Sequence, residues 1–453
     1  MTELKRSIEG FWWNPSEPEK KYFGTLKYFE DIVRLDIVFS VEQLHSCEQE
    51  EFLKHFTNDA LPIIHGYTGG NSRKKYTLIN VTIKSNEYPN FYIFSFGKLP
   101  IYVESVLEGI LLESISDDFI AQAYICFDEL SEWVPPPYIK ETYIQDEELY
   151  CLKYSGKESK KLLFKDDKLQ LFITAYLSGT KSLGNNYSYT IFNDAKLYFN
   201  CNKKINLQNF NNYVFSIKSF LWLCTGKCHN ISDIQLCYLE KNKNEIPSKT
   251  WFKKSIVEDR RTKCILKYEN IFNLEQIYLK WVCFLNENKS TIRMLLQILE
   301  RPSTYFDDRK TENLVQIFEA LSDSVFGENI AIDEKYFKSL VTDQRALKNF
   351  EKNKTSPVLL SKLAYFFWER EFLNFIEDFN YIYGDHDVET IKKFLINAKE
   401  IRVKYSHGGK ENKDKKIELR PECINVLLYK GIRLMLFKYI LKLKNINIEI
   451  EPI

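Results

Sequence analysis

KYTLINVTI, residues 75–83, decides the fold of the first part of the chain. It combines β-branched and aromatic residues with partial alternation of apolar and polar positions, which is typical of a strand with one buried face. VRLDIVF (33–39) and NFYIFSF (90–96) have the same character. HGYTGGNSRKK (65–75), between two of these runs, has the glycine-rich polar composition of a turn. We therefore predict a sheet or a barrel in about the first 135 residues.

A second mixed region covers about residues 140–255. EWVPPPY (132–138) precedes it and reads as a stiff connector, because consecutive prolines exclude a helix interior and a central strand. The segments with strand character are KLQLFITAYL, YSYTIFN and AKLYFNC. NFNNYVFSIKSFLWLCTG is predicted to be a helix that ends at Gly226. We expect one β-rich amino-terminal module, residues 1–255, with two possible lobes (1–135 and 140–255).

Helical periodicity dominates from residue 256 to residue 453. Apolar residues recur there at spacings of three and four, which predicts a bundle of six helices. The six segments are NLEQIYLKWVCFLNE, STIRMLLQILERP, TENLVQIFEALSDSVFG, SPVLLSKLAYFFWEREFLNFIEDFNYIYG, VETIKKFLINAKEIRVKYSHG and PECINVLLYKGIRLMLFKYILKL. The expected fold class is therefore α+β: a β-rich module followed by an all-α bundle.

Composition indicates a globular protein of the cytoplasm. The chain has 453 residues, of which 44% are hydrophobic, and its ten cysteines lack the short paired spacings of a secreted scaffold. No run approaches the roughly 20 apolar residues of a membrane span, and MTELKRSIEGFWW lacks the apolar core of a signal peptide. We therefore expect cytoplasmic localisation with reduced thiols and no membrane partner.

Charge is unevenly distributed although the net charge is only +1. Residues 391–453 carry 15 Lys or Arg against 7 Asp or Glu, so this segment is basic. A basic segment is where a polyanion such as RNA would bind. A solvated lysine-rich helix face gives the same count, and taken alone that is the favoured interpretation.

KEIRVKYSHGG (399–409) is the segment with the clearest catalytic chemistry. Arg402 precedes His407 by five residues at a predicted helix end. Histidine titrates near neutral pH and can exchange a proton with a nucleophile or a leaving group. Arginine stabilises the negative charge that develops on a reacting phosphate. Neither role needs a metal or a cofactor, and the 2′-hydroxyl of RNA would supply the nucleophile.

This motif in an all-α bundle resembles the HEPN superfamily, many of whose members are metal-independent ribonucleases. The resemblance implies a HEPN-type bundle and a homodimer, in which two Arg402/His407 pairs surround a shared cleft. The residue after the motif arginine is often polar in these nucleases, commonly Asn, but it is Val403 here. That departure leaves open a non-catalytic HEPN module that binds RNA or a protein.

The amino-terminal sequence carries a second resemblance. EGFWWNPSEPEKKYFGTLKYFEDIVRLDI (9–37) and IIHGYTGGNSRKKYTLINVTI (63–83) resemble the amino-terminal domain of ApeA, a family of bacterial anti-phage proteins with a carboxy-terminal HEPN nuclease. The resemblance implies abortive infection: the amino-terminal module senses a phage-derived trigger, for example a protein, and the HEPN domain then cuts RNA, with tRNA the expected class.

Four further residues are supporting candidates. Glu319 and Asp323 lie one turn apart on a predicted helix, and a carboxylate there would orient His407 or Arg402. A solvated acidic face is the favoured alternative for them. Lys404 and Tyr405, inside the motif, complete the supporting set.

Two other clusters have a chemical and a structural interpretation. Cys224, Cys228, His229 and Cys237 lie within fourteen residues, but the second half lacks the paired spacing of a zinc site, so ordinary reduced cysteines are favoured over a metal. The paired Trp12 and Trp13 would make an exposed ligand-binding surface or pack under the sheet. Core packing is the favoured interpretation for both tryptophans.

Overall fold

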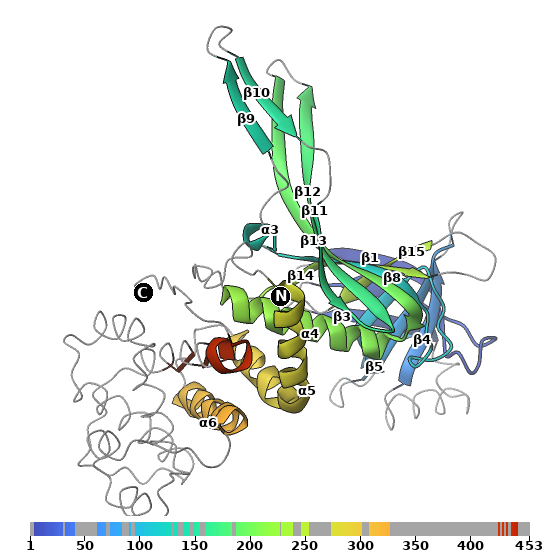
Figure 1. The fold of residues 1–453 in the computed structure, drawn as a ribbon. Coiled ribbons are helices and arrows are strands. Elements are labelled where there is room, and N and C mark those ends of the chain that lie inside the picture. Colours follow the sequence, from blue (N-terminus) through green and yellow to red (C-terminus); the bar gives the residue numbers. More distant parts are fainter. Residues whose placement is uncertain are drawn as a thin grey trace, which may run out of the picture. The chain divides into compact units, whose positions relative to one another are not determined.

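A computed structural model describes the fold in two compact units (Figure 1). The first comprises residues 1–217 and 229–256, and the second comprises residues 218–228 and 257–453. The described residues are 4–29, 32–40, 61–68, 73–83, 90–91, 96–128, 130–134, 139–144, 149–154, 159–183, 187–226, 228–238, 246–252, 273–300, 308–326, 425, 428–429, 432–433 and 436–442.

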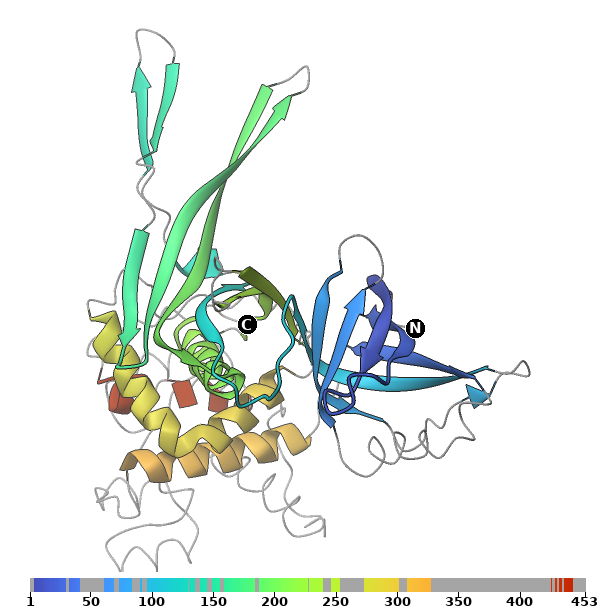
Figure 2. The ribbon, with the colours of Figure 1, turned by 90° about the vertical axis from the view of Figure 1, so that its right-hand side faces the viewer.

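Six antiparallel strands of the first unit close into a barrel, drawn mainly in blue in Figure 2. Each strand pairs with the next in the order β1-β2-β3-β7-β5-β4, and β4 pairs back with β1. Their bounds are β1 (Arg6–Trp13), β2 (Tyr22–Tyr28), β3 (Val33–Ser40), β4 (Leu61–Thr68), β5 (Lys75–Thr82) and β7 (Phe96–Glu108). The predicted sheet or barrel is thus confirmed as a closed barrel.

Inward-pointing side chains, which alternate with outward-pointing ones along a strand, fill the barrel. Along β1, Ile8, Gly10 and Trp12 are buried, whereas Glu9 and Phe11 between them are exposed. The same period of two recurs in β2, because successive side chains of a strand point to opposite faces, whereas β4 and β5 are buried on both faces over 63–66 and 76–79. Large apolar side chains therefore occupy the interior as one continuous core.

Trp12 is the largest side chain of this core and is fully buried. Its ring leaves no room for a Cβ on the facing strands: a Cβ on Gly66 would lie 2.2 Å from the ring, and one on Gly24 would lie 3.2 Å from it. The indole Nε1 donates a hydrogen bond to the carbonyl of Gly24 at 3.2 Å. Trp13 is buried as well, which confirms core packing for both tryptophans.

The boundary of one predicted turn was wrong. His65–Thr68 belong to β4, where His65 pairs with Thr77 and Gly66 pairs with Tyr76 of β5. Gly66 is needed for close packing against Trp12 and not for a turn conformation. Sequence composition alone does not separate these two uses of glycine.

An open antiparallel sheet continues from the barrel in the first unit. Its strand order is β11-β12-β13-β8-β14-β15, and β15 pairs with β7 of the barrel. The bounds are β8 (Ile120–Phe127), β11 (Ser159–Lys165), β12 (Leu169–Leu183), β13 (Tyr187–Ile205), β14 (Ile231–Tyr238) and β15 (Ile246–Phe252). The three segments predicted as strands between residues 168 and 201 all lie in β12 and β13, which confirms those predictions.

The remaining short elements flank this sheet. The predicted connector 132–138 is partly helical, since Glu132 and Trp133 end the short helix α3 (Leu130–Trp133). β9 (Ile139–Ile144) and β10 (Leu149–Tyr154) form a separate two-stranded sheet. β6 (Asn90–Phe91) pairs with β7, so the segment predicted as one strand at 90–96 contributes its two ends to different elements.

Helix α4 (Leu207–Thr225) packs its first half on one face of the open sheet. The ring of Phe210 lies 5.3 Å from that of Phe199 on β13, and both are fully buried. The helix ends at Gly226, whose φ of +80° is a left-handed conformation that glycine adopts without strain. The predicted helix and its end are therefore confirmed.

The second unit includes the last turns of α4, together with α5 (Leu274–Leu299) and α6 (Asp308–Phe326). Two helices were predicted over α5, and its two helical segments meet at a kink with non-helical backbone at Asn288, between the predicted segments. There the side-chain amide donates to the carbonyl of Phe284 at 3.1 Å and accepts from the hydroxyl of Ser324 at 2.6 Å. The polar stretch around Asn288 marks this kink and not a loop between helices.

Residues near the end of the chain close the carboxy end of α4 within the second unit. The guanidinium of Arg433 is buried and donates from Nε and Nη2 to the carbonyl of Leu223, at 3.1 and 2.6 Å. Tyr429 donates to the carbonyl of Gly226 at 2.5 Å and accepts from Trp222 Nε1 at 2.8 Å. A short π-helix, η4 (Leu436–Ile440), follows. The segments predicted as helices at 356–384 and 388–408 lie outside the described residues.

Candidate functional site

The predicted catalytic motif lies in a part of the chain that the structure does not describe. This applies to Arg402, His407, Lys404 and Tyr405. The backbones of Glu319 and Asp323 lie in α6, as predicted for a helix, but their side chains are outside the description. The proposed carboxylate support for the motif therefore stays a prediction.

The cysteine-rich segment around α4 forms no metal site among the described residues. Cys224, Cys228, His229 and Cys237 are all buried, and no three of the described His, Cys, Asp and Glu side chains are grouped to hold an ion. His229 shares a hydrogen bond through Nδ1 with the carbonyl of Asp128 at 2.8 Å. Burial raises the pKa of Cys228 to about 12, so this thiol stays protonated at neutral pH. These side chains contribute to packing in the described structure.

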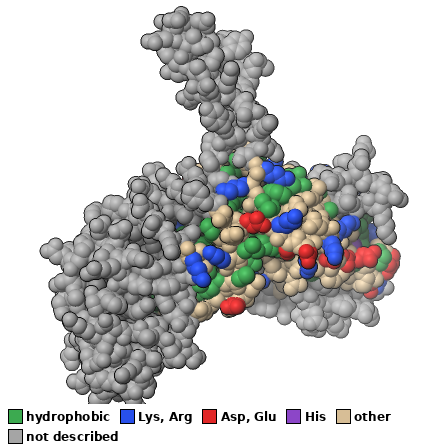
Figure 3. Space-filling view, viewed as in Figure 1, with side chains coloured by type: hydrophobic (Ala, Val, Ile, Leu, Met, Phe, Trp, Pro, Cys, Tyr) green, Lys and Arg blue, Asp and Glu red, His purple; other side chains and the backbone are tan. Residues whose placement is uncertain are grey.

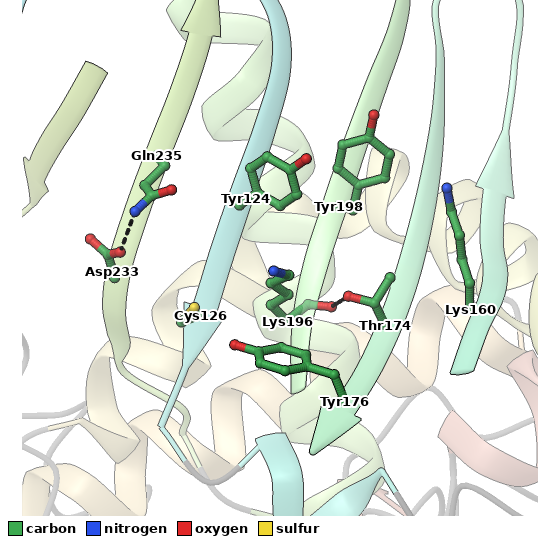
Figure 4. A pocket seen from close by; sticks show the side chains of 9 residues that line it. All are labelled: Tyr124, Cys126, Lys160, Thr174, Tyr176, Lys196, Tyr198, Asp233 and Gln235. Carbon is green, nitrogen blue, oxygen red and sulfur yellow. Dashed lines mark hydrogen bonds between the residues drawn. The ribbon is translucent and has the colours of Figure 1, made fainter. Parts of the chain in front are cut away.

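A groove on the open sheet is the best-defined candidate site in the described part of the chain. It has a volume of about 530 Å³ and crosses five adjacent strands of the first unit, on the face opposite α4 (Figure 4). Its walls are Tyr124, Cys126, Lys160, Thr174, Tyr176, Lys196, Tyr198, Asp233 and Gln235. This volume lies within the usual range of small-ligand sites.

One row of the groove consists of aromatic rings. Tyr124 on β8, Tyr198 on β13 and Phe172 on β12 are direct cross-strand partners. The centroids of Tyr124 and Tyr198 are 4.9 Å apart and those of Tyr198 and Phe172 are 6.2 Å apart, with both pairs stacked. Such pairs stabilise a sheet, and two of the three rings, those of Tyr124 and Tyr198, line the groove.

The neighbouring row is polar and carries two ammonium groups. Lys160 on β11 pairs with Thr174 on β12, which in turn pairs with Lys196 on β13. The Nζ of Lys160 lies 4.0 Å from the ring centre of Phe172. The Nζ of Lys196 lies 4.6 Å from the ring centre of Tyr176. These cation–π contacts restrict the ammonium groups while each retains hydrogen-bond donors.

The groove ends at β14 with acceptors. Gln235 pairs with Tyr124 across the strands and donates to the carboxylate of Asp233 at 3.4 Å. Asp233 is exposed and pairs with Cys126. Burial is the main cause that raises the pKa of the Cys126 thiol, and the Asp233 carboxylate raises it further, so the thiol is a poor nucleophile. The groove chemistry is therefore suited to binding: cations at one end and an acceptor at the other.

Sequence reasoning found two of the five strands of this groove, β12 and β13, but not the groove. Phe172, Thr174 and Tyr176 alternate with buried residues along β12, and Lys196 and Tyr198 do so along β13. That alternation shows that these side chains share a face, but it does not show which strands are neighbours. Over the described part of the surface in Figure 3, charges of both signs and hydrophobic side chains are interspersed. The net charge of this surface therefore does not indicate a binding site.

A closed barrel joined to an open sheet with an aromatic, cationic groove defines a β-rich module. Comparison with protein families identifies it: the model of ApeA N-terminal domain 1 matches residues 7–282. The chain therefore belongs to the ApeA family. Searches of curated proteins and of solved structures found no match to the chain. Among the helices that the structure describes, none has the length and apolar character of a membrane span.

Proposed function

We propose that the chain is an anti-phage defence protein, in which the β-rich module is followed by a carboxy-terminal HEPN endoribonuclease. The observation that carries the proposal is the family match over residues 7–282 in a chain that also contains Arg402 and His407 at HEPN spacing. Membership of the ApeA family supports the role in defence. The motif and the basic segment 391–453 support the action on RNA.

The proposed chemistry needs only side chains of this protein. His407 takes a proton from the ribose 2′-hydroxyl, and the resulting oxygen attacks the adjacent phosphorus. Arg402 stabilises the negative charge that builds up on the phosphate oxygens. The 5′-oxygen of the next nucleotide leaves as it gains a proton, and the product ends in a 2′,3′-cyclic phosphate. Two copies of the motif in a homodimer would supply the two proton transfers.

The test is cleavage of tRNA in EDTA by the full-length protein, compared with Arg402→Ala and His407→Ala. We expect each substitution to reduce the rate at least 100-fold, the usual contribution of a general acid or base. His386→Ala serves as the matched control, since it removes another histidine of the same half of the chain. Product ends are identified by a 5′-hydroxyl that a polynucleotide kinase labels directly, and by a 3′ end that a poly(A) polymerase extends only after the cyclic phosphate has been removed.

Two outcomes would contradict the proposal. Folded, dimeric variants of Arg402 and His407 that cut at the wild-type rate would exclude the motif as the active site. The protein could also bind RNA with steep salt dependence but fail to cut it, with and without a phage-derived trigger. That result would favour the non-catalytic module that Val403 leaves open.

A further inference from the structure

We propose that the groove on the open sheet binds a short segment of single-stranded nucleic acid. This inference concerns the amino-terminal module and goes beyond the proposed cleavage site. It holds whether or not Arg402 and His407 cut RNA, and its test does not depend on cleavage.

The size of the groove favours several nucleotides over one. Its wall residues come from five neighbouring strands, β11, β12, β13, β8 and β14. Strands in a sheet are about 4.8 Å apart, so the groove extends over about 19 Å. Sheet surfaces with exposed aromatic side chains typically hold two or three bases of a single strand.

The two rows match the two parts of a nucleotide chain. The rings of Tyr198 and Tyr124 line the groove and offer apolar surface against which bases can pack. The adjacent row carries Lys160 and Lys196, whose ammonium groups reach over these rings: Lys160 Nζ lies 4.7 Å from the ring centre of Tyr198, and Lys196 Nζ lies 5.0 Å from that of Tyr124. Phosphates that follow the bases would therefore meet cations along one side.

The acceptors at β14 make the two ends of the groove chemically different. Asp233 and Gln235 carry no positive charge and are the wall residues furthest from Lys160 in the strand order. A carboxylate repels phosphate but accepts hydrogen bonds from the exocyclic amines of bases. We therefore expect a base at the Asp233 end and phosphates at the lysine end.

The experiment measures binding of a fluorescein-labelled eight-nucleotide oligoadenylate, as RNA and as DNA, by fluorescence anisotropy at several salt concentrations. The protein is full-length His407→Ala, so that the probe stays intact if the motif is a nuclease. The groove variant is Lys160→Ala/Lys196→Ala. The matched control is Lys165→Ala/Lys168→Ala, which removes two exposed lysines from the same β11–β12 hairpin but outside the groove.

The groove variant should weaken binding about tenfold and reduce the slope of log K against log salt by about 1.4, because each phosphate contact to a single strand contributes about 0.7. The control should leave both quantities within twofold of the parent protein. Tyr198→Leu should weaken binding about tenfold at an unchanged salt slope, since it removes a ring and no charge. Because Lys160 is exposed, Lys160→Ala alone is a further variant that preserves the fold, with half the change in slope.

Two results would overturn the inference. One is that the parent protein binds neither the RNA nor the DNA probe. The other is that groove and control variants bind equally well, which would assign the affinity to another surface such as the basic segment 391–453.

Discussion

The barrel and the open sheet have the same antiparallel pairing but differ in what covers the two faces of their strands. The barrel turns one face of every strand inward and fills the space with apolar side chains around Trp12. The open sheet covers one face with α4 and carries rings, ammonium groups and a carboxylate on the other. Both belong to the first unit, and β15 pairs with β7 to join them.

This difference separates the residues that fill the core of the module from those that line its groove. A closed barrel has no free edge and, when filled, no internal space for a ligand. An open sheet with one covered face retains a surface whose residues are not fixed by core packing. Substitutions in the barrel should therefore change the free energy of unfolding, whereas those in the groove should change binding.

The largest effect is expected for Trp12→Ala. It removes a fully buried indole and its hydrogen bond to Gly24, and should lower the free energy of unfolding by about 3–5 kcal/mol. Phe11→Ala is the matched control: Phe11 is adjacent on β1 but 39% exposed, in contact with Phe23 and Tyr67, and should cost about 1 kcal/mol. Equal losses in urea unfolding would contradict the inward and outward alternation of β1.

Gly66→Ala should cost about 1–3 kcal/mol, because the new methyl group would overlap the Trp12 ring. Combination with Trp12→Leu should make the alanine nearly neutral, since a smaller side chain leaves space for it. Thermal unfolding of the two single variants and the double variant measures this coupling. Strict additivity would show that Gly66 is required for its backbone and not for packing.

A pH effect should arise in the barrel from His65. Its Nε2 lies 2.6 Å from the carbonyl of Leu112, and burial lowers its pKa below the ordinary value of 6.5. Between the two pKa values the unfolded chain binds a proton that the folded chain does not. The free energy of unfolding should therefore fall as the pH drops below 6.5, by at most about 1.4 kcal/mol per pH unit.

His65→Gln provides the comparison for this titration. Glutamine retains a donor for the Leu112 carbonyl but does not titrate, so urea midpoints measured from pH 7.5 to pH 5 should lose part of their pH dependence. An unchanged pH profile would show that His65 does not contribute.

The smallest effect on stability is expected in the open sheet. Lys160→Ala removes the ammonium from the ring of Phe172, and the exposed contact should contribute about 0.5 kcal/mol. Lys160→Arg should retain it. A loss above 2 kcal/mol in thermal unfolding would make Lys160 part of the core and weaken the contrast with the barrel.

Several individual strands and helix α4 could be predicted from the sequence, because the spacing of apolar residues within one element depends only on neighbours in the chain. The strands at 33–39 and 75–83 and the helix that ends at Gly226 follow from residue type and spacing. The break near Asn288 follows from the polar stretch there, but its hydrogen bond with Ser324 could not be predicted, since the two residues are 36 positions apart. The groove depends on the neighbours of β8, which pairs with β13 and β14 and not with the strand that follows it in the chain.

The hydrogen bonds to the last carbonyls of α4 limit where the chain can be cut into fragments. The family match stops at residue 282, but Arg433 and Tyr429 supply the donors for the carbonyls of Leu223 and Gly226. A fragment that ends at the match boundary would leave these two carbonyls, and the indole N–H of Trp222, without the groups that satisfy them in the whole chain. A shortened protein of this kind would therefore need replacement partners for the last turn of α4 before it could be studied in isolation.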